Sequence, residues 1–520
     1  MAPPYSKSII KAIVFFILIL LTLVAVGCER QAPIGSAPLP NTSSTPLVPT
    51  HPPVTSTVPP TPSFFLLPTR IPGSPILTPT LDTISGTSAP VQGPETYIVQ
   101  YGDTLGKIAN QYGMDATMLA AVNSLTNPDT LYVGQELTIP HPTPQGGGLA
   151  FKIIPDSELI YGPMSITLDV DQFIRLKGGY LSQYTEMVDG QLLTGSQLLL
   201  RVAQFYSVNP RLLLAVLEYR SRWVTQSDPS PDSEGEPIGR LDGWHDGLYK
   251  QLTWTANELN RGYYLWKAGS RRNWVLADQS AVSVAAGINP GTAGVQNLFA
   301  QLDDFPTWVR DVSSDGLFKT YVALFGYPFD LAIEPIVPAN LTQPVMLLPF
   351  EKGVLWAFTG GPHGGWDTGS AWAALDFAPA GTEGCVQSNA WVTAVADGLI
   401  VRTGDGAVVE DLDGDGYEQT GWTVLYMHME ENGRVSRGEY VKTGDRIGHP
   451  SCEGGFADAT HLHIARKFNG EWISADGLIP FNFQGWVSSG TGVEYDGYLK
   501  LGGRTIEAFD GNNPINQIQK

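Results

Sequence analysis

Hydrophobic and polar positions divide the chain into segments with different periodicities. An uncharged apolar run covers residues 12–27, and a stretch with very little charge, dominated by Pro, Ser and Thr, follows over residues 29–95. Residues 96–141 combine short strand-like runs with apolar positions at helical spacing. Residues 149–345 show longer helical periodicities, whereas the chain from residue 346 onward has short apolar runs between Gly turns, which predicts strands. The pattern predicts a multidomain protein with an antiparallel β domain at its C-terminal end.

The N-terminal segment predicts export. Lys7 and Lys11 precede the apolar run, and small residues lead to Cys28. A positive region, an apolar region and small residues before a cleavage point make a secretory signal. Residues 1–28 resemble the signal of bacterial lipoproteins, whose Cys is lipidated, with Ala25 where Leu is the commoner residue. An uncleaved membrane anchor is the alternative. Both interpretations place the rest of the chain on the outer face of a bacterial membrane or in the cell wall.

Composition limits the partners and the number of domains. A chain of 520 residues is too long for one core, so roughly two to four domains are expected. The formal net charge of −20 argues against a nucleic-acid partner, because phosphate binding needs clustered Lys and Arg. Residues 29–95 cannot bury enough apolar surface to offset their ordering entropy, so they are expected to form an extended linker.

The cysteines fit an exported protein. With Cys28 assigned to a lipid, Cys385 and Cys452 remain as an even pair. Because exported domains keep disulfides, this pair predicts a disulfide bond. Two free buried thiols are the alternative.

Residues 96–141 have a βααβ order, in which Asp103 is expected to cap the first helix. The segments "YIVQYGDTLGKIANQYG" and "LYVGQELTIP" closely resemble the two ends of a LysM module. The resemblance implies binding to glycans that contain N-acetylglucosamine, such as peptidoglycan. The residues expected to line the sugar groove are Gly102, Asp103, Thr104, Leu105 and the loop 127–131. A LysM fold without sugar affinity is the alternative.

Residues 149–345 are rich in Trp and Tyr and show helical periodicity, for example over residues 198–205 and 212–219. Their large buried aromatic area predicts a mostly helical domain of undefined role. The segment "NPRLLLAVLEYRSRW" resembles the part of lysozyme-like transglycosylases that carries the catalytic Glu, here Glu218. Those enzymes have Ser directly after the Glu, whereas Tyr219 follows here. A structural or substrate-positioning domain is therefore preferred, and a glycan-cleaving domain stays the alternative.

Histidines concentrate in the C-terminal region, where five of the eight fall within about 100 residues. In the strand-like segment "THLHIARK", His461 and His463 are two residues apart and project from the same face. Asp376 lies in the strand-like segment "WAALDFAP", and His363 lies in the Gly-rich loop "GGPHGGW". Two imidazoles and one carboxylate, with a fourth position left for water, are typical of catalytic zinc.

This combination resembles the lysostaphin-type zinc peptidases, and within them the β-lytic, LasA-like branch. The resemblance covers roughly residues 348–486, where a His in a "Y-x-H" strand lies between the Asp and the H-x-H pair. It implies a peptidase domain over residues 346–486, followed by an extension over residues 487–520. The implied fold is a small antiparallel β-sandwich of the duplicated hybrid motif type, with one zinc ion in a groove. The implied metal ligands are His363, Asp376 and His463, and the implied catalytic residues are His461 and His428.

A hydrolytic mechanism follows from this set. Zinc lowers the pKa of bound water to about 7 and polarises a carbonyl. His461 is expected to take the proton of the water and pass it to the leaving amine. His428 is expected to hydrogen-bond the oxyanion or to position the water. Tyr426 is expected to pack in the core or, from the same strand face, to support His428. The sequence therefore predicts an endopeptidase that cuts peptide cross-links of peptidoglycan.

Three further alternatives remain open, one on calcium binding and two on function. Asp411, Asp413 and Asp415 match the start of a calcium loop, but Trp422 stands where an EF-hand has Glu, which excludes an EF-hand. Bound calcium and a plain hairpin turn both stay open there. The main functional alternative is a non-catalytic scaffold or activator that binds the wall and keeps the peptidase fold, and a purely structural lipoprotein is another.

Overall fold

A computed structural model describes much of the chain. The described residues are 95–100, 103–112, 119–120, 122–123, 125, 131–139 and 143–520. The expectations for the export signal, for Cys28, for the linker, for Gly102 and for residues 127–130 lie outside the described residues and stay predictions. The chain divides into two units, residues 1–61 and 62–520, and all described residues belong to the second. Within the described part of the chain, no helix is long and apolar enough to cross a membrane.

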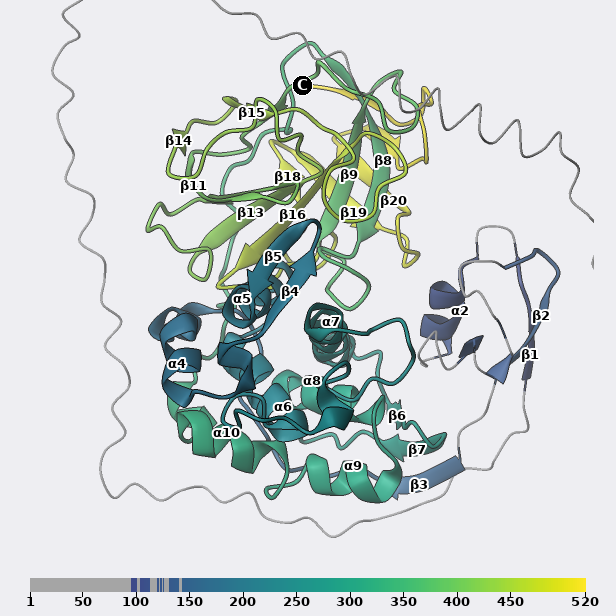
Figure 1. The fold of residues 1–520 in the computed structure, drawn as a ribbon. Coiled ribbons are helices and arrows are strands. Elements are labelled where there is room, and N and C mark those ends of the chain that lie inside the picture. Colours follow the sequence, from purple (N-terminus) through teal and green to yellow (C-terminus); the bar gives the residue numbers. More distant parts are fainter. Residues whose placement is uncertain are drawn as a thin grey trace, which may run out of the picture. The chain divides into compact units, whose positions relative to one another are not determined.

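The region after the linker has a strand at each end. Strand β1 (Glu95–Ile98) pairs antiparallel with β2 (Glu136–Ile139), and helix α2 (Leu105–Gln111) follows β1 (Figure 1). The core of this unit includes Ile108 and Leu137, which are 1% and 0% exposed. Apolar residues at helical and strand spacing thus converge on one small core.

Thr104, rather than Asp103, caps helix α2. The Thr104 hydroxyl accepts a hydrogen bond from the Lys107 N–H at 3.2 Å. The Asp103 carboxylate instead accepts hydrogen bonds from the Gln100 N–H at 2.7 Å and the Tyr97 hydroxyl at 2.8 Å. The capping role expected for Asp103 is therefore wrong, because the residue directly before the helix is Thr104 and Asp103 folds back over the preceding turn.

The middle region is built from helices and short strands. Its α-helices are α4 (Val170–Lys177), α5 (Gly195–Tyr206), α6 (Pro210–Ser221), α7 (Leu248–Lys267), α8 (Pro290–Ala300), α9 (Phe305–Asp311) and α10 (Leu317–Phe325) (Figure 1). Its strands are β3 (Thr143–Gly147), β4 (Thr185–Val188), β5 (Gln191–Thr194), β6 (Asn273–Val275) and β7 (Ser280–Ser283). Its 3-10 helices are η1 (Asp156–Glu158), η2 (Pro163–Thr167), η3 (Tyr180–Ser182), η4 (Pro231–Ser233) and η5 (Pro328–Leu331).

Local sequence fixes where the two consecutive helices α5 and α6 begin. Thr194 and Gln197 form a capping box at the start of α5. The side chain of Asn209 caps α6, and Pro210 occupies the first helical position, where its missing N–H is not needed. Ser207 adopts the left-handed conformation that ends α5. The tight turn between the two helices places the end of α5 against the C-terminal region.

The C-terminal region contains a nine-stranded antiparallel sheet in the order β14-β11-β12-β13-β16-β9-β8-β22, with β17 paired to β16. Its strands are β8 (Leu355–His363), β9 (Ala374–Pro379), β11 (Gly398–Gly404), β12 (Ala407–Asp411), β13 (Trp422–Met427), β14 (Tyr440–Val441), β16 (Leu462–Phe468), β17 (Glu471–Trp472) and β22 (Gln517–Gln519). The expected antiparallel, strand-rich peptidase region is confirmed.

Residues 487–520 are built into this region. Strands β18 (Asn482–Phe483), β19 (Trp486–Gly490), β20 (Gly497–Leu501) and β21 (Arg504–Glu507) form a second sheet, and β10 (Val392–Thr393) pairs with β15 (Arg446–Gly448). Strand β22 adds to the main sheet beside β8. Residues 487–520 therefore pair with strands of this region in the structure, and the expected domain boundaries stay predictions.

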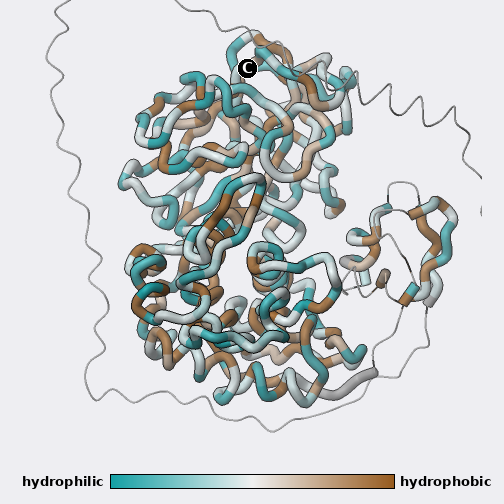
Figure 2. The backbone as a smooth tube through the Cα atoms, viewed as in Figure 1, coloured by the Kyte–Doolittle hydropathy of each residue, from teal (hydrophilic) through white to brown (hydrophobic). Residues whose placement is uncertain are grey.

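The two faces of the nine-stranded sheet are covered by different layers. One face buries Leu375, Tyr426 and Ile464 in the core of the C-terminal region. The other face buries Ala374 and Ala465 against the helices of the middle region. Figure 2 shows hydrophobic and hydrophilic positions interleaved along the chain in both regions. Because side chains alternate along a strand, every second residue of β9 and β16 faces the middle region.

Candidate metal centre

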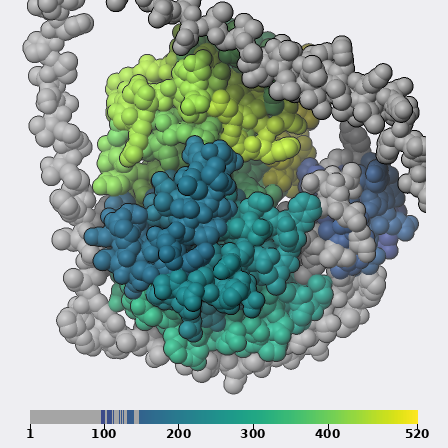
Figure 3. Space-filling model, viewed as in Figure 1, coloured from purple at the N-terminus to yellow at the C-terminus, as the bar shows by residue number. Residues whose placement is uncertain are grey.

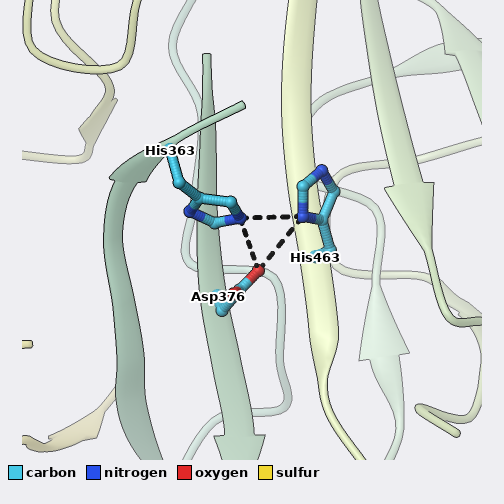
Figure 4. Close-up of side chains that lie close together, drawn as sticks. All are labelled: His363, Asp376 and His463. Atoms are coloured by element: carbon cyan, nitrogen blue, oxygen red, sulfur yellow. Dashed lines mark hydrogen bonds and ion pairs between the residues drawn. The ribbon is translucent and has the colours of Figure 1, made fainter. Parts of the chain in front are cut away.

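Three adjacent strands bring His363, Asp376 and His463 together. His463 of β16 lies directly opposite Asp376 of β9, and Gly360 of β8 lies on the other side of Asp376. His363 is the last residue of β8 rather than part of a loop, as the sequence suggested, because β8 extends through the glycines that precede it. All three side chains point into one space (Figure 4).

The separations of the three ligand atoms suit a tetrahedral metal. Asp376 Oδ1 lies 3.3 Å from His363 Nε2 and 3.2 Å from His463 Nδ1, and the two nitrogens are 3.0 Å apart. Ligand atoms that lie about 2.0–2.1 Å from a tetrahedral zinc ion are about 3.3 Å from one another. The donor set therefore fits a catalytic zinc ion in both chemistry and spacing.

Backbone carbonyls orient both imidazoles. His363 donates its Nδ1–H to the Gly361 carbonyl at 2.8 Å, and His463 donates its Nε2–H to the Gly365 carbonyl at 3.2 Å. The other nitrogen of each ring then carries a lone pair directed at Asp376. Asp376 Oδ1 is buried and accepts no hydrogen bond from any residue that the structure describes. Three acceptors directed at one point without a donor are the arrangement that a bound cation satisfies.

The charges of the cluster fit the same interpretation. Burial by itself would raise the pKa of Asp376, but the neighbouring His363 and His461 hold it well below its usual value. Burial lowers the pKa of His463. Burial also acts to lower the pKa of His363, but the neighbouring Asp376 raises it above its usual value. Metal ligation requires a charged carboxylate, and the lowered pKa of Asp376 favours that state.

Two further histidines lie beside the three ligands. His461 Nε2 is 4.0 Å from Asp376 Oδ1, and the His461 Nδ1–H donates to the Ala459 carbonyl at 2.7 Å. The rings of His428 and His461 are 4.4 Å apart, and the His428 Nδ1–H donates to the Glu453 carbonyl at 3.1 Å. Burial and the neighbouring His461 lower the pKa of His428 to about 3. The structure therefore brings together all five side chains expected from the sequence.

His428 and Tyr426 do not share a strand face. His428 directly follows β13 and has a φ of 63°, in the left-handed region, which turns its ring toward the other histidines. Tyr426 is 0% exposed, donates its hydroxyl proton to Glu410 Oε2 at 2.6 Å and accepts from the Val395 N–H at 2.8 Å. The supporting role suggested for Tyr426 is therefore wrong, and its core role is the observed one.

A cleft of about 1370 Å³ opens over the five side chains. It is also lined by Tyr495, whose ring stacks on His363 with centroids 4.3 Å apart and planes 17° apart. The Gly361 N–H donates to the Tyr495 carbonyl at 2.6 Å, which ties this segment to the end of β8. The sequence analysis missed Tyr495, because an isolated Tyr far from the histidines carries no signal of its own.

Cys385 and Cys452 form a disulfide bond, with sulfur atoms 2.05 Å apart. Glu453, whose carbonyl accepts the His428 Nδ1–H, directly follows Cys452. The disulfide therefore ties a neighbour of the histidine cluster to the segment after β9.

The calcium expectation gains no support. Asp411, Asp413 and Asp415 lie close enough to hold an ion, but their oxygens already accept hydrogen bonds from the turn itself. Asp411 accepts from the Gly416 N–H at 2.9 Å, and Asp415 accepts from the Thr420 hydroxyl at 2.7 Å. The segment is organised as a carboxylate-stabilised turn.

Glu218 of the middle region serves as a structural acceptor. Its Oε2 accepts from the N–H groups of Val224 at 3.1 Å and Thr225 at 3.0 Å, and its Oε1 accepts from the Thr225 hydroxyl at 2.6 Å. Both carboxylate oxygens are thus engaged within the chain after α6, which disfavours the transglycosylase role.

Among the expected glycan-binding residues, Leu105 is 3% exposed and belongs to the core of its unit. The side chain of Asp103 is partly exposed, and that of Thr104 is exposed. Asp103 and Thr104 are therefore accessible to a sugar, whereas Leu105 is almost fully buried. The glycan-binding role of these residues stays a prediction.

Profiles of three families match the chain in sequence order. They are the LysM domain over residues 97–140, the LasA N-terminal domain over residues 152–338, and peptidase family M23 over residues 378–475. The chain therefore combines a LysM domain with a LasA-like family M23 peptidase, and the middle region is of the type found in LasA. The resemblance inferred from the motifs is confirmed, whereas the LasA-type identity of the middle region had been missed.

Among characterised relatives, protease LasA from Pseudomonas aeruginosa is 25% identical over 349 residues, which cover 62% of this chain and 75% of that protein. The cortical fragment-lytic enzyme of Bacillus subtilis is 44% identical over 46 residues, or 9% of this chain and 11% of that enzyme.

Among solved structures, the M23 metalloprotease pseudoalterin is 25% identical and matches 35% of this chain and 100% of its own, with a TM-score of 0.28. The catalytic domain of lysostaphin from Staphylococcus simulans is 25% identical over 24% of this chain and 89% of its own, with a TM-score of 0.17.

Proposed function

We propose that this chain is a zinc-dependent endopeptidase that hydrolyses the peptide cross-links of bacterial peptidoglycan. One observation carries the proposal: His363, Asp376 and His463 direct three lone pairs at one point in a cleft that also holds His428 and His461. The separations between the three ligand atoms are those of a tetrahedral zinc site. The family M23 match supports peptide hydrolysis as the reaction class.

His461 and His428 have different roles in the proposed reaction. When bound, zinc supplies a water molecule with a pKa of about 7 and polarises the scissile carbonyl. His461 holds its own proton on Nδ1 through the Ala459 carbonyl, so its Nε2 is free to accept the proton of the attacking water and to return it to the leaving amine. His428 holds its proton on Nδ1 in the same way, so its Nε2 is an acceptor suited to positioning the water.

The LysM domain supports a substrate in the cell wall. A LysM domain beside a peptidase raises the local concentration of the peptidase at its polymer, which we take to be peptidoglycan bound through N-acetylglucosamine. The predicted signal and Cys28 would attach the chain by a lipid to the outer face of a bacterial membrane. The Pro-rich linker would then let the folded parts reach the wall.

Zinc content and peptide release test the proposal together. The wild-type chain should contain one zinc ion and release peptides from purified sacculi, and His463→Ala should do neither. Mass spectrometry of the released fragments would identify the bond that is cut. A wild-type chain that binds sacculi but releases no peptide would instead support the non-catalytic scaffold.

A further inference from the structure

The segment between strands β15 and β16 contacts both histidines that lie beside the metal ligands. His428 directly follows β13 and His461 directly precedes β16, so the two residues belong to different strands. Ser451 lies between them, because isolated β-bridges pair Ser451 with His461 and Pro450 with Met429. All of these residues belong to the C-terminal region, which is drawn in green to yellow in Figure 3. Ser451 is thus placed next to both proposed proton-transfer groups.

The backbone of Ser451 connects the two histidines. The Ser451 N–H donates to the His428 carbonyl at 2.6 Å, and the His461 N–H donates to the Ser451 carbonyl at 3.3 Å. The first of these bonds supports a strained residue, because the φ of 63° at His428 lies in the left-handed region, which is unfavourable for a residue with a Cβ atom. The main chains of His428 and His461 are therefore held relative to each other by one residue.

The Ser451 hydroxyl completes a ring of hydrogen bonds that begins and ends at His428. It donates to the His428 carbonyl at 3.0 Å and accepts from the Glu453 N–H at 3.0 Å. The Glu453 carbonyl in turn accepts the Nδ1–H of His428 at 3.1 Å. The hydroxyl therefore couples the backbone of His428 to the acceptor that orients its imidazole.

The turn between β11 and β12 holds the same acceptor from another side. A Cβ atom on Gly406 would lie 2.3 Å from the Glu453 carbonyl oxygen, so only glycine allows this approach, and the φ of 72° at Gly406 also favours glycine. The Met429 N–H, directly after His428, donates to the Gly406 carbonyl at 2.8 Å. Gly406 and the Ser451 hydroxyl therefore both restrain the carbonyl that orients the His428 ring.

We infer that Ser451 is a positioning residue for His428 and His461, and that its hydroxyl sets the tautomer and the orientation of the His428 ring. The inference rests on the proposed function, because it adds a residue to the proposed proton-transfer machinery. With its proton held on Nδ1, His428 has Nε2 left as an acceptor. Loss of the Ser451 hydroxyl would release the Glu453 N–H and let the ring rotate or change its tautomer.

Kinetics of peptide release by the zinc-loaded full-length chain give the first test. Ser451→Ala should lower kcat about tenfold and keep KM within twofold of the wild type, because a misplaced proton-transfer group slows the chemical step and leaves peptide binding intact. Its zinc content should equal that of the wild type, because the hydroxyl of Ser451 bonds to His428 and Glu453 rather than to a metal ligand. Ser451→Thr keeps a hydroxyl and should recover most of the rate. A fall in kcat matched by a fall in zinc content would overturn the inference.

The tautomer of His428 gives a readout that does not depend on activity. In the full-length chain with isotope-labelled histidine, the nitrogen chemical shifts distinguish a proton on Nδ1 from a proton on Nε2. The His428 signals are identified by their absence from His428→Ala. The wild type should show the Nδ1–H form alone, and Ser451→Ala should show both forms. A Ser451→Ala spectrum with the Nδ1–H form alone would contradict the inference.

Ser388→Ala is the matched control. It removes the hydroxyl of a buried serine, which accepts from the Ala390 N–H at 3.1 Å within its own turn. Its kcat and its His428 signals should equal those of the wild type, and a kcat of Ser451→Ala within twofold of this control would also overturn the inference.

Two further outcomes are separated by the design. If Ser451→Ala does not fold, the isosteric pair Ser451→Thr and Ser451→Val decides the matter, because the two variants differ in the hydroxyl. The Thr variant should then show the Nδ1–H form of His428 and the Val variant both forms. A wild-type chain that releases no peptide would contradict the proposed function alone, and the His428 tautomer would still decide the role of Ser451.

Discussion

Two clusters in the C-terminal region place three potential ligands within 4.8 Å of one another, yet they differ in what their atoms already contact. In the first, His363, Asp376 and His463 direct free lone pairs at a common point. In the second, the carboxylates around Asp411 accept hydrogen bonds from the N–H groups of their own turn. The ligand atoms lie close together in both clusters. Only in the first are they without hydrogen-bond donors among the described residues.

The difference shows how a metal site is distinguished from an acidic turn. Imidazoles are neutral at the metal-facing nitrogen, so they gather around one carboxylate without repulsion. Three carboxylates repel one another, and burial together with the neighbouring Asp413 raises the pKa of Asp411 to about 7. In the acidic turn, backbone N–H donors and a bound proton offset this repulsion. In the histidine cluster, the described part of the chain supplies no such donor, and a bound cation would take that role.

The largest effect should come from removing a ligand of the histidine cluster. His463→Ala should abolish stoichiometric zinc and lower peptide release from sacculi by at least about a thousandfold, since the metal contributes several kcal/mol to the transition state. His449→Ala is the control, because His449 stacks on Trp391 away from the cluster. If His463→Ala kept its zinc and its activity, the histidine cluster would not be the metal site, and its contrast with the acidic turn would fail.

The next effect separates ligation from proton transfer. His461→Ala should keep the zinc content of the wild type and lower kcat by about 10²–10⁴-fold, because general acid–base catalysis contributes that much. Metal analysis and peptide release on the same preparations provide the measurement. Loss of zinc equal to that of His463→Ala would show that His461 is a ligand.

A smaller effect concerns Glu218, a carboxylate engaged in the same way as the acidic turn. Glu218→Ala should lower the free energy of unfolding by about 1–2 kcal/mol, since three donors lose their acceptor. Urea unfolding measures the loss, and peptide release at a permissive temperature should equal that of the wild type. Loss of glycan cleavage in this variant would revive a catalytic role for Glu218.

The smallest effect should come from the acidic turn itself. Because the pKa of Asp411 is raised to about 7, the folded state binds more protons than the unfolded state between about pH 4 and about pH 7. The free energy of unfolding should therefore fall as the pH rises through this window. Asp413→Asn removes a neighbouring charge and should reduce the fall by about 1 kcal/mol, as measured by urea unfolding at pH 5 and pH 8.

Added calcium gives a second measurement on this turn. Calcium should leave the free energy of unfolding of the wild type and of Asp413→Asn unchanged. Calcium-dependent stabilisation of the wild type that is lost in Asp413→Asn would place the acidic turn among the metal sites.

The sequence anticipated the parts of the site that depend on local periodicity. His461 and His463 are two residues apart at the start of β16, so they face one side of the sheet whatever the rest of the fold does. Asp376 lies within a short apolar run that the structure shows as β9. The LysM resemblance and the peptidase resemblance rested on such local segments, and both are matched by family profiles.

The parts that were missed depend on long-range contacts. Tyr495 reaches His363 because its segment bonds to the end of β8, more than 130 residues earlier. His428 leaves its strand through a left-handed turn, which a strand-like sequence does not reveal. Neither feature has a local pattern, since each follows from where distant segments meet.

The sequence by itself determined which residues could form a metal site, because the types and spacings of His and Asp are set by the chain. Only the tertiary structure decided which lone pairs of these side chains accept no hydrogen bond and which contacts hold the side chains in place. The contacts of Tyr206 with Asp367 and of Asn257 with Gly369 join segments more than 100 residues apart. Such contacts form only when the helices of the middle region pack on the catalytic sheet, because no local interaction within either segment specifies them.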